Sequence, residues 1–235
     1  MVKNKKNTKS QPKSSSKFAF WMIGIIAAFV LGFIFIGNHS KSDEKANSNK
    51  NIDYSNQPFH GDKSAPVSII EFGDYKCPNC KNFNENVVPL IEKELVDTGK
   101  AKLYFMNYAF INTDSTRTAK FAESVYQVLG NEPFWEFHDL IYKKQPEDTK
   151  YEKIDLFTEK FLTDTLKEVA DEDDVNKVVK HFNADKSKES FNKDMDLAKK
   201  LGATGTPAIY VNGQYFDGQT MDDLKDMVDK AAKGE

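Results

Sequence analysis

The only two cysteines of the chain, Cys77 and Cys80, stand in a C-x-x-C arrangement. The apolar run Val67–Phe72 predicts a buried strand before them, and apolar residues three and four apart over Asn82–Leu95 predict a helix after them. The pair therefore lies at a strand-to-helix junction, where free backbone N–H groups and the helix dipole favour a thiolate. We predict that Cys77 is the nucleophile, and that Cys80, one turn further, closes or resolves a disulfide with it.

Two other uses of the pair have to be weighed. A structural disulfide is possible, but so small a loop restricts the unfolded chain little and stabilises weakly. A metal site needs about four ligands, commonly from two such pairs, and the chain has no second pair. The four histidines also lack ligand spacing: His39, His60, His138 and His181. We therefore favour redox chemistry, with no metal and no bound cofactor.

The N-terminus has the pattern of a membrane anchor. Residues 1–17 carry six lysines and no acid, and the twenty residues 18–37 carry no charge. A span of about 20 apolar residues crosses the hydrocarbon core as a helix, and a basic flank stays in the cytoplasm. We predict a cytoplasmic stub over 1–17 and a transmembrane signal anchor over 18–37. A cleaved signal peptide is the alternative, but no small-x-small site or cysteine for lipidation follows.

The rest of the chain is predicted to lie outside the cell membrane. Residues 38–56 are polar and read as a flexible tether, and 57–235 are enough for one domain. Without the six lysines of the stub, 27 basic residues remain against 36 acidic ones, which disfavours nucleic-acid binding. The single arginine, Arg117, suggests no role by itself.

The order of the remaining elements predicts an α/β fold. A second strand is expected over Ala101–Tyr108, and a third over Ala208–Val211, followed by an Asn212-Gly213 hairpin and a last helix. Between them, helical spacing dominates, so a helical insertion is expected over about 113–190 within one sheet. Helices are expected over 115–129, 133–144, 153–169, 174–182 and 186–201. The large apolar residues of this insertion are expected to form its core: Phe121, Trp135, Phe137, Leu140, Phe157 and Phe161.

Two motifs together resemble one family. Gly73-Asp74-Tyr75-Lys76-Cys77-Pro78-Asn79-Cys80 after a strand, and Gly205-Thr206-Pro207-Ala208 more than a hundred residues later, are similar to the DsbA-like thiol:disulfide oxidoreductases of the thioredoxin superfamily. The similarity is greatest to membrane-anchored BdbD-type members of Gram-positive envelopes. It covers about 57–235. It implies a thioredoxin-like fold with an inserted helical subdomain.

The resemblance also implies roles for residues away from the cysteines. It makes Pro207 the cis-proline that packs against the active-site disulfide, with the backbone of Thr206 free to pair with an extended substrate. It makes Glu71 the acid buried beneath the disulfide, which exchanges a proton with Cys80. The residues alone leave open an ordinary strand-opening proline at 207 and a surface-facing acid on an edge strand at 71.

The dipeptide Pro78-Asn79 departs from many strongly oxidising members, which carry histidine between the cysteines. Asn79 can donate a hydrogen bond to sulfur, but it carries no charge. We therefore expect a weaker bias toward the reduced enzyme than a histidine would give, with the same sign.

The function expected from these features is a disulfide oxidase on the extracytoplasmic side of the cell membrane. It would pass the Cys77–Cys80 disulfide to reduced exported proteins, and the resemblance implies reoxidation by a quinone-linked membrane thiol oxidase. Two alternatives remain at this stage. One is an envelope reductase or isomerase, as in cytochrome c maturation, and the other is a tethered binding module whose cysteines only staple the fold.

Overall fold

The structure, a computed structural model, describes residues 52–235. The predictions of a cytoplasmic stub over 1–17, an anchor over 18–37 and most of the tether over 38–56 fall outside the described residues. Among helices within 52–235, none has the length and apolar character needed to span a membrane. At the end of the predicted tether, Ile52 and Tyr54 pack against the core, and the Tyr54 ring lies 4.6 Å from the ring of Tyr104. The prediction that the tether continues to residue 56 is therefore wrong, because these apolar side chains are folded onto the domain.

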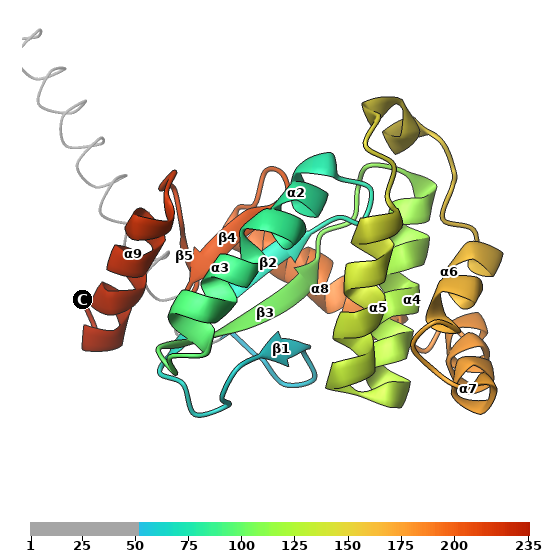
Figure 1. The fold of residues 1–235 in the computed structure, drawn as a ribbon, viewed down its shortest axis with the longest axis horizontal. Helices are drawn as coiled ribbons and strands as arrows, with labels where there is room; N and C mark the ends of the chain where they lie inside the picture. Colours follow the sequence, from blue (N-terminus) through green and yellow to red (C-terminus); the bar gives the residue numbers. More distant parts are fainter. Residues whose placement is uncertain (1–51) are drawn as a thin grey trace, which may run out of the picture. The chain divides into compact units, whose positions relative to one another are not determined.

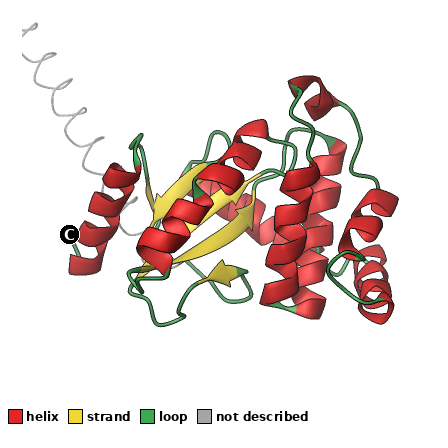
Figure 2. Cartoon of the chain, in the orientation of Figure 1, coloured by secondary structure: helices red, strands yellow, loops and turns green. Residues whose placement is uncertain are grey.

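A five-stranded sheet forms the centre of the domain, in the order β1-β3-β2-β4-β5 (Figure 2). Strand β2 pairs in parallel with β3, and every other pairing is antiparallel. The strands are β1 (Phe59–His60), β2 (Val67–Gly73), β3 (Ala101–Asn107), β4 (Ala208–Val211) and β5 (Gln214–Tyr215). The predicted strands around residues 67, 101 and 208 are confirmed. Strand β1 was not predicted, because two residues are too short to show a period.

Helices cover both faces of the sheet (Figure 1). They are α2 (Pro78–Asn86), α3 (Val88–Ile91), the π-turn η1 (Glu92–Val96), α8 (Lys188–Leu201) and α9 (Met221–Lys233). Alternation along β2 sends Val67 and Ile69 toward α3 and α9, and Ile70 and Phe72 toward α8. Because all seven residues of β2 are buried, this strand is the centre of the core.

The helical insertion stands beside this sheet (Figure 1). It contains α4 (Thr113–Leu129), α5 (Asn131–Lys144), the 3-10 turn η2 (Thr149–Lys153), α6 (Glu159–Leu166) and α7 (Glu172–Asn183). The thioredoxin-like arrangement with a helical insertion is as predicted. Of its six predicted core residues, Phe121, Trp135, Phe137 and Phe157 are buried, while Leu140 and Phe161 are half-buried. The same cluster of buried side chains includes Cys77 and Cys80, so the insertion packs directly against the cysteines.

Two predicted helices are interrupted. The helix expected over 82–95 breaks at Val87, because Pro89 has no N–H and its ring excludes a regular helix through that turn. The helix expected over 153–169 is only α6, because residues 154–158 are irregular. Apolar spacing continues through both regions, but in residues 154–157 the backbone groups bond to side chains of Lys76, Asp114 and Arg117.

The hairpin after β4 agrees with its sequence signal. Asn212 and Gly213 have φ angles of 46° and 82°, both positive as the tightest hairpin turns require. The Asn212 side chain also accepts the N–H of Ser68 at 2.9 Å, which ties the turn to the start of β2. This hairpin fixes β4 beside β2, and so brings residues 206–207 next to the cysteines.

Candidate active site

The cysteines lie where β2 gives way to α2, as predicted. Cys77 is the N-cap of α2 and Pro78 is its first residue, a position where the missing N–H of proline costs nothing. The Cys77 N–H donates to the Asp74 carbonyl at 2.9 Å, which closes the turn between strand and helix. Both cysteines are free thiols in the structure, with Cys77 6% exposed and Cys80 fully buried. Cys77 is thus the only one of the two sulfurs that a substrate can reach.

The two thiols are biased in opposite directions. The pKa of Cys77 is lowered to about 6, chiefly by the hydrogen bond from the Cys80 thiol. Burial opposes this shift, and the neighbouring Thr206 and the N–H groups of Cys80 and Asn79 add to it. Burial raises the pKa of Cys80 well above its ordinary value, and the hydrogen bond to Cys77 raises it further. Near neutral pH the pair is therefore a Cys77 thiolate beside a Cys80 thiol.

Glu71 lies in the middle of β2 and is 2% exposed. It pairs across the sheet with Phe105 on one side and Ile209 on the other, so it is on a central strand. Burial, and then the charge of Cys77, raise its pKa to about 8. One of its oxygens has no hydrogen-bond partner among the described residues. The alternative that Glu71 is a surface-facing acid is therefore excluded. The Glu71 carboxyl interacts electrostatically with both sulfurs and is protonated below its pKa.

Residues 206–207 approach the cysteines from the start of β4. The Thr206–Pro207 peptide bond is cis. The Cys77 thiol donates a hydrogen bond to the Thr206 carbonyl at 3.3 Å. An ordinary strand-opening proline does not account for this contact, since the segment lies directly against Cys77. Substrate pairing with the Thr206 backbone stays a prediction.

The dipeptide between the cysteines is on the outer side of the first turn. Pro78 is half-buried and Asn79 is exposed. Asn79 contributes its backbone N–H to the Cys77 sulfur, and no charge accompanies it. The thiolate is thus held by hydrogen bonds from the helix start and from Cys80.

An apolar hollow of about 370 Å³ lies beside Pro207. Helices α2 and α3, strand β4, the segment after β5 and the start of α9 contribute its walls, among them Phe83, Leu90, Ile209 and Phe216. Leu90 is 43% exposed and Tyr215 is 58% exposed at its rim. Because exposed apolar side chains cluster at binding surfaces, this hollow suits an apolar polypeptide segment next to Cys77.

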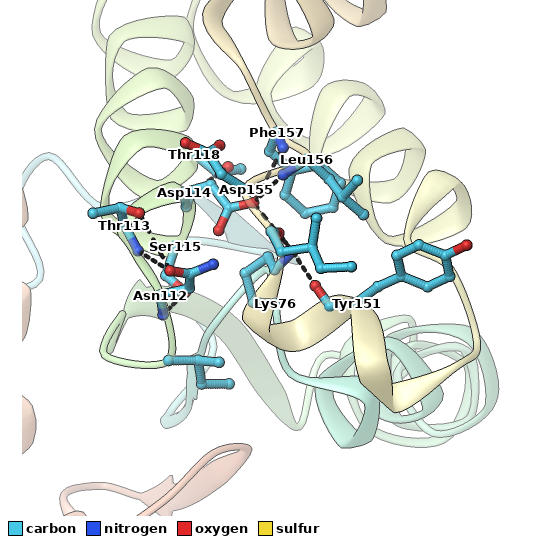
Figure 3. A network of polar contacts seen from close by, with 12 residues as sticks. Lys76, Asn112, Thr113, Asp114, Ser115, Thr118, Tyr151, Asp155, Leu156 and Phe157 are labelled. Carbon is cyan, nitrogen blue, oxygen red and sulfur yellow. Dashed lines mark hydrogen bonds and ion pairs between the residues drawn. The ribbon is translucent and has the colours of Figure 1, made fainter.

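The structure adds residues that the sequence analysis did not single out. Lys76, directly before Cys77, is 2% exposed and its Nζ lies 3.1 Å from Oδ2 of the fully buried Asp114 (Figure 3). Arg117, to which no role was given, forms a two-point ion pair with Asp155 at 2.6 and 3.0 Å. Each of these residues is 38 residues from its partner in the chain, so no local sequence pattern could predict the two ion pairs.

A buried aromatic group stands behind the cysteines. The Tyr75 hydroxyl lies 3.0 Å from Nδ1 of His138, and both residues are fully buried. Burial lowers the pKa of His138 to about 3, so this imidazole stays neutral. His138 is therefore part of the packing behind the site.

Comparison with known proteins places this geometry in a family. The thioredoxin family model matches residues 53–230, most of the described domain. The chain belongs to the thioredoxin family. It is 37% identical to the probable disulfide bond formation protein D of Bacillus anthracis, over 94% of this chain and 99% of that protein. It is 36% identical to disulfide bond formation protein D of Bacillus subtilis, over 76% of this chain and 78% of that one.

Solved structures agree with this membership. The oxidised BdbD of Bacillus subtilis superposes with a TM-score of 0.70 at 32% identity, over 77% of this chain and 96% of that chain. The thiol-disulfide exchange protein alpha-DsbA2 of Wolbachia pipientis gives 0.65 at 26% identity, over 83% and 97%. Within the thioredoxin family, the chain is a DsbA-like thiol:disulfide oxidoreductase that resembles the BdbD-type members.

Proposed function

We propose that this thioredoxin-family chain is an extracytoplasmic disulfide oxidase, which introduces disulfide bonds into exported proteins through Cys77 and Cys80. The observation that carries the proposal is the opposite bias of the two thiols, with the pKa of Cys77 lowered to about 6 and that of Cys80 raised. A stabilised thiolate favours the reduced enzyme, and an enzyme whose reduced form is favoured gives its disulfide away.

The size of this bias follows from the pKa. Relative to an ordinary thiol with a pKa of 9.0, a Cys77 pKa of about 6 favours the reduced protein by roughly 1 kcal/mol at pH 7. For a two-electron couple this corresponds to roughly 20 mV in the oxidising direction. It is an upper figure, because solvent screens part of the charge on the sulfur. The proposed enzyme is thus a moderate oxidant, as expected for an uncharged Asn79.

The reaction takes two exchange steps. A substrate thiolate attacks the Cys77 sulfur of the enzyme disulfide, the Cys77–Cys80 bond breaks, and Cys80 leaves as a thiolate. Glu71, protonated below its pKa of about 8 and in electrostatic interaction with Cys80, is the proton donor proposed for this step. A second substrate thiolate then attacks the substrate sulfur of the mixed disulfide, and Cys77 leaves as a stable thiolate. The substrate has lost two electrons and two protons, and the enzyme holds the two electrons as a thiolate and a thiol.

Substrate binding is proposed along the cis-proline side of the site. The Thr206 carbonyl next to Cys77 and the apolar hollow beside Pro207 would hold an extended segment with apolar side chains. Reduced, incompletely folded proteins present such segments. Sequence resemblance supports the remaining parts of the proposal: anchoring by residues 18–37 and reoxidation by a quinone-linked membrane thiol oxidase.

Trapping tests this function in cells. In a Cys80→Ala variant the Cys77 thiolate attacks the disulfide of an oxidised partner and releases one partner thiolate. Because Cys80 is not there to displace the partner, it stays attached to Cys77. We expect exported proteins with paired cysteines, together with a membrane thiol oxidase. Recovery of cytoplasmic proteins alone would contradict the proposal.

A further inference from the structure

Lys76 is buried next to the nucleophile, yet its charged group faces the insertion. Its Nζ donates to the Tyr151 carbonyl at 2.7 Å and to the Ile154 carbonyl at 2.9 Å, and it lies 3.1 Å from Oδ2 of Asp114. The three N–H groups of the ammonium therefore each have an acceptor. It also lies 5.0 Å from the centre of the Phe157 ring.

Asp114 also binds the backbone a few residues after Tyr151 and Ile154. Its Oδ2 accepts the N–H groups of Leu156 and Phe157 at 2.8 and 3.1 Å (Figure 3). Asp114 stands in the first turn of α4, where the helix dipole favours a carboxylate. A buried charge pair with this many hydrogen bonds is specific in geometry, since either charge alone would be costly to bury.

Arg117 completes the hold on residues 151–157. It pairs with the carboxylate of Asp155 and donates to the Phe157 carbonyl at 3.0 Å. This stretch includes the irregular residues 154–157, whose backbone groups bond to side chains of α4 and of the loop before Cys77. Its position relative to Cys77 is thus set by side chains.

The loop before Cys77 also binds the backbone of the segment between β3 and α4. Asp74 Oδ2 accepts the N–H groups of Phe110 and Ile111 at 2.9 and 3.1 Å. The two tied segments each carry an exposed apolar side chain, Phe110 at 53% and Ile154 at 44%. The carbonyls of residues 151 and 154 both bind the side chain of Lys76, the residue directly before Cys77.

We propose that Lys76 is a positioning residue: its buried pair with Asp114 fixes residues 151–157 beside Cys77, so that Ile154 forms a wall for the substrate polypeptide. This inference rests on the proposed function for its substrate, a reduced polypeptide with apolar residues near its cysteines. A segment that reaches the Cys77 sulfur from the Pro207 side must continue past the opposite side of the site. We place residues 151–157 on that side, because Lys76, directly before Cys77, binds the carbonyls of Tyr151 and Ile154.

The alternative role for Lys76 is electrostatic, as a positive charge that holds the Cys77 thiolate. The geometry argues against it, because the Lys76 charge is matched by Asp114 at 3.1 Å and its donors are used by the insertion. The two roles differ in what they change. A positioning residue changes the apparent affinity for a polypeptide, and an electrostatic one changes the titration of Cys77.

The test uses a peptide with two cysteines flanked by apolar residues, assayed in both redox directions, and dithiothreitol as a small substrate. The variants are Lys76→Met, Lys76→Met with Asp114→Asn, and Ile154→Ser. Lys150→Met is the matched control, since Lys150 is an exposed lysine of η2 paired with the exposed Asp148. The second variant leaves no buried charge unpaired, and the third changes only an exposed side chain.

We expect the KM for the peptide to rise about threefold or more in all three variants, with kcat and the dithiothreitol rate changed by less than about twofold. Lys150→Met should match the wild type. Proteolysis within 146–158 should also be faster in the two Lys76 variants. An unchanged KM in folded Lys76 variants and in Ile154→Ser would overturn the proposal, as would a raised Cys77 pKa with an unchanged KM.

The assay in both directions keeps the two proposals apart. If the wild type only reduces the oxidised peptide, the oxidase proposal fails, and the positioning role is still read from the KM of that reaction. If Lys76→Met does not fold, Ile154→Ser decides: an unchanged peptide KM refutes the wall.

Discussion

Replacing Glu71 by glutamine should change how stability depends on pH. The pKa of Glu71 is about 8 in the folded protein, against an ordinary value of 4.5. Because the pKa of Glu71 is higher in the folded protein, protonated Glu71 makes its full contribution to the unfolding free energy below pH 4.5. This contribution is lost as pH rises from 4.5 toward 8. Between pH 5 and pH 7.5 this loss integrates to about 3 kcal/mol.

The variant should lack this loss. We therefore expect the change in unfolding free energy from pH 5 to pH 7.5 to be about 3 kcal/mol more favourable in Glu71→Gln than in the wild type. Both proteins are compared reduced, and because the Cys77 charge is one cause of the raised Glu71 pKa, the difference includes the coupling between these two groups. Using this difference also removes any constant cost of the buried amide.

Urea unfolding at the two pH values measures the effect, with Glu136→Gln, an exposed position on α5, as the control. The same variant should exchange disulfides more slowly, because Cys80 loses its proton donor. Parallel pH dependence of the wild type and Glu71→Gln would refute the reasoning that Glu71 is a buried acid with a raised pKa.

Three further predictions concern the cysteines and the membrane. Thiolate absorbance of the reduced protein should titrate near 6, and Cys80→Ala should move the Cys77 midpoint upward, because the Cys80 thiol is the chief cause of the low pKa; an unmoved midpoint would contradict this. The stability of the reduced relative to the oxidised protein should grow as pH rises from about 6 toward 9 and disappear as pH falls through 6, since the folded Cys77 pKa is depressed. Thermal melts of both forms check this, and a gap independent of pH would count against it. Protease added to cells stripped of wall should digest the domain after residue 37, and full protection would reject the predicted topology.

Local patterns account for the parts of the fold that were predicted. The β2 run, the turn at Cys77 and the start of α2 lie within twenty residues, so periodicity and helix-start chemistry describe them together. The position of Pro207 came from the resemblance, since nothing near it in the chain distinguishes it from a strand-opening proline. The break in the helix at Pro89 had a visible signal, which the continuing apolar spacing outweighed.

The missed parts depend on contacts between distant residues. Lys76 reads as a solvated lysine, and only the fold brings it to Asp114, 38 residues on, inside the core. Residues 154–157 carry apolar side chains at helical spacing, but their backbone groups bond to Lys76, Asp114 and Arg117. When backbone groups bond to side chains in place of the next helical turn, the spacing of apolar residues in the sequence does not reveal it.

The direction of electron flow decides between an oxidase and a reductase. The purified oxidised domain is mixed in equal amount with a reduced protein that has two pairing cysteines, and both are measured by mass spectrometry after the thiols are blocked. We expect that the substrate gains a disulfide and the enzyme becomes a dithiol. In a second mixture, reduced Cys80→Ala meets the disulfide-bonded substrate, and the Cys77 thiolate should attack that disulfide and form a mixed disulfide while one substrate thiol is released. An oxidase is ruled out if the oxidised enzyme leaves the substrate reduced while the reduced enzyme opens the substrate disulfide. Cys77 is not the nucleophile if Cys77→Ala forms the mixed disulfide at Cys80 and Cys80→Ala forms none.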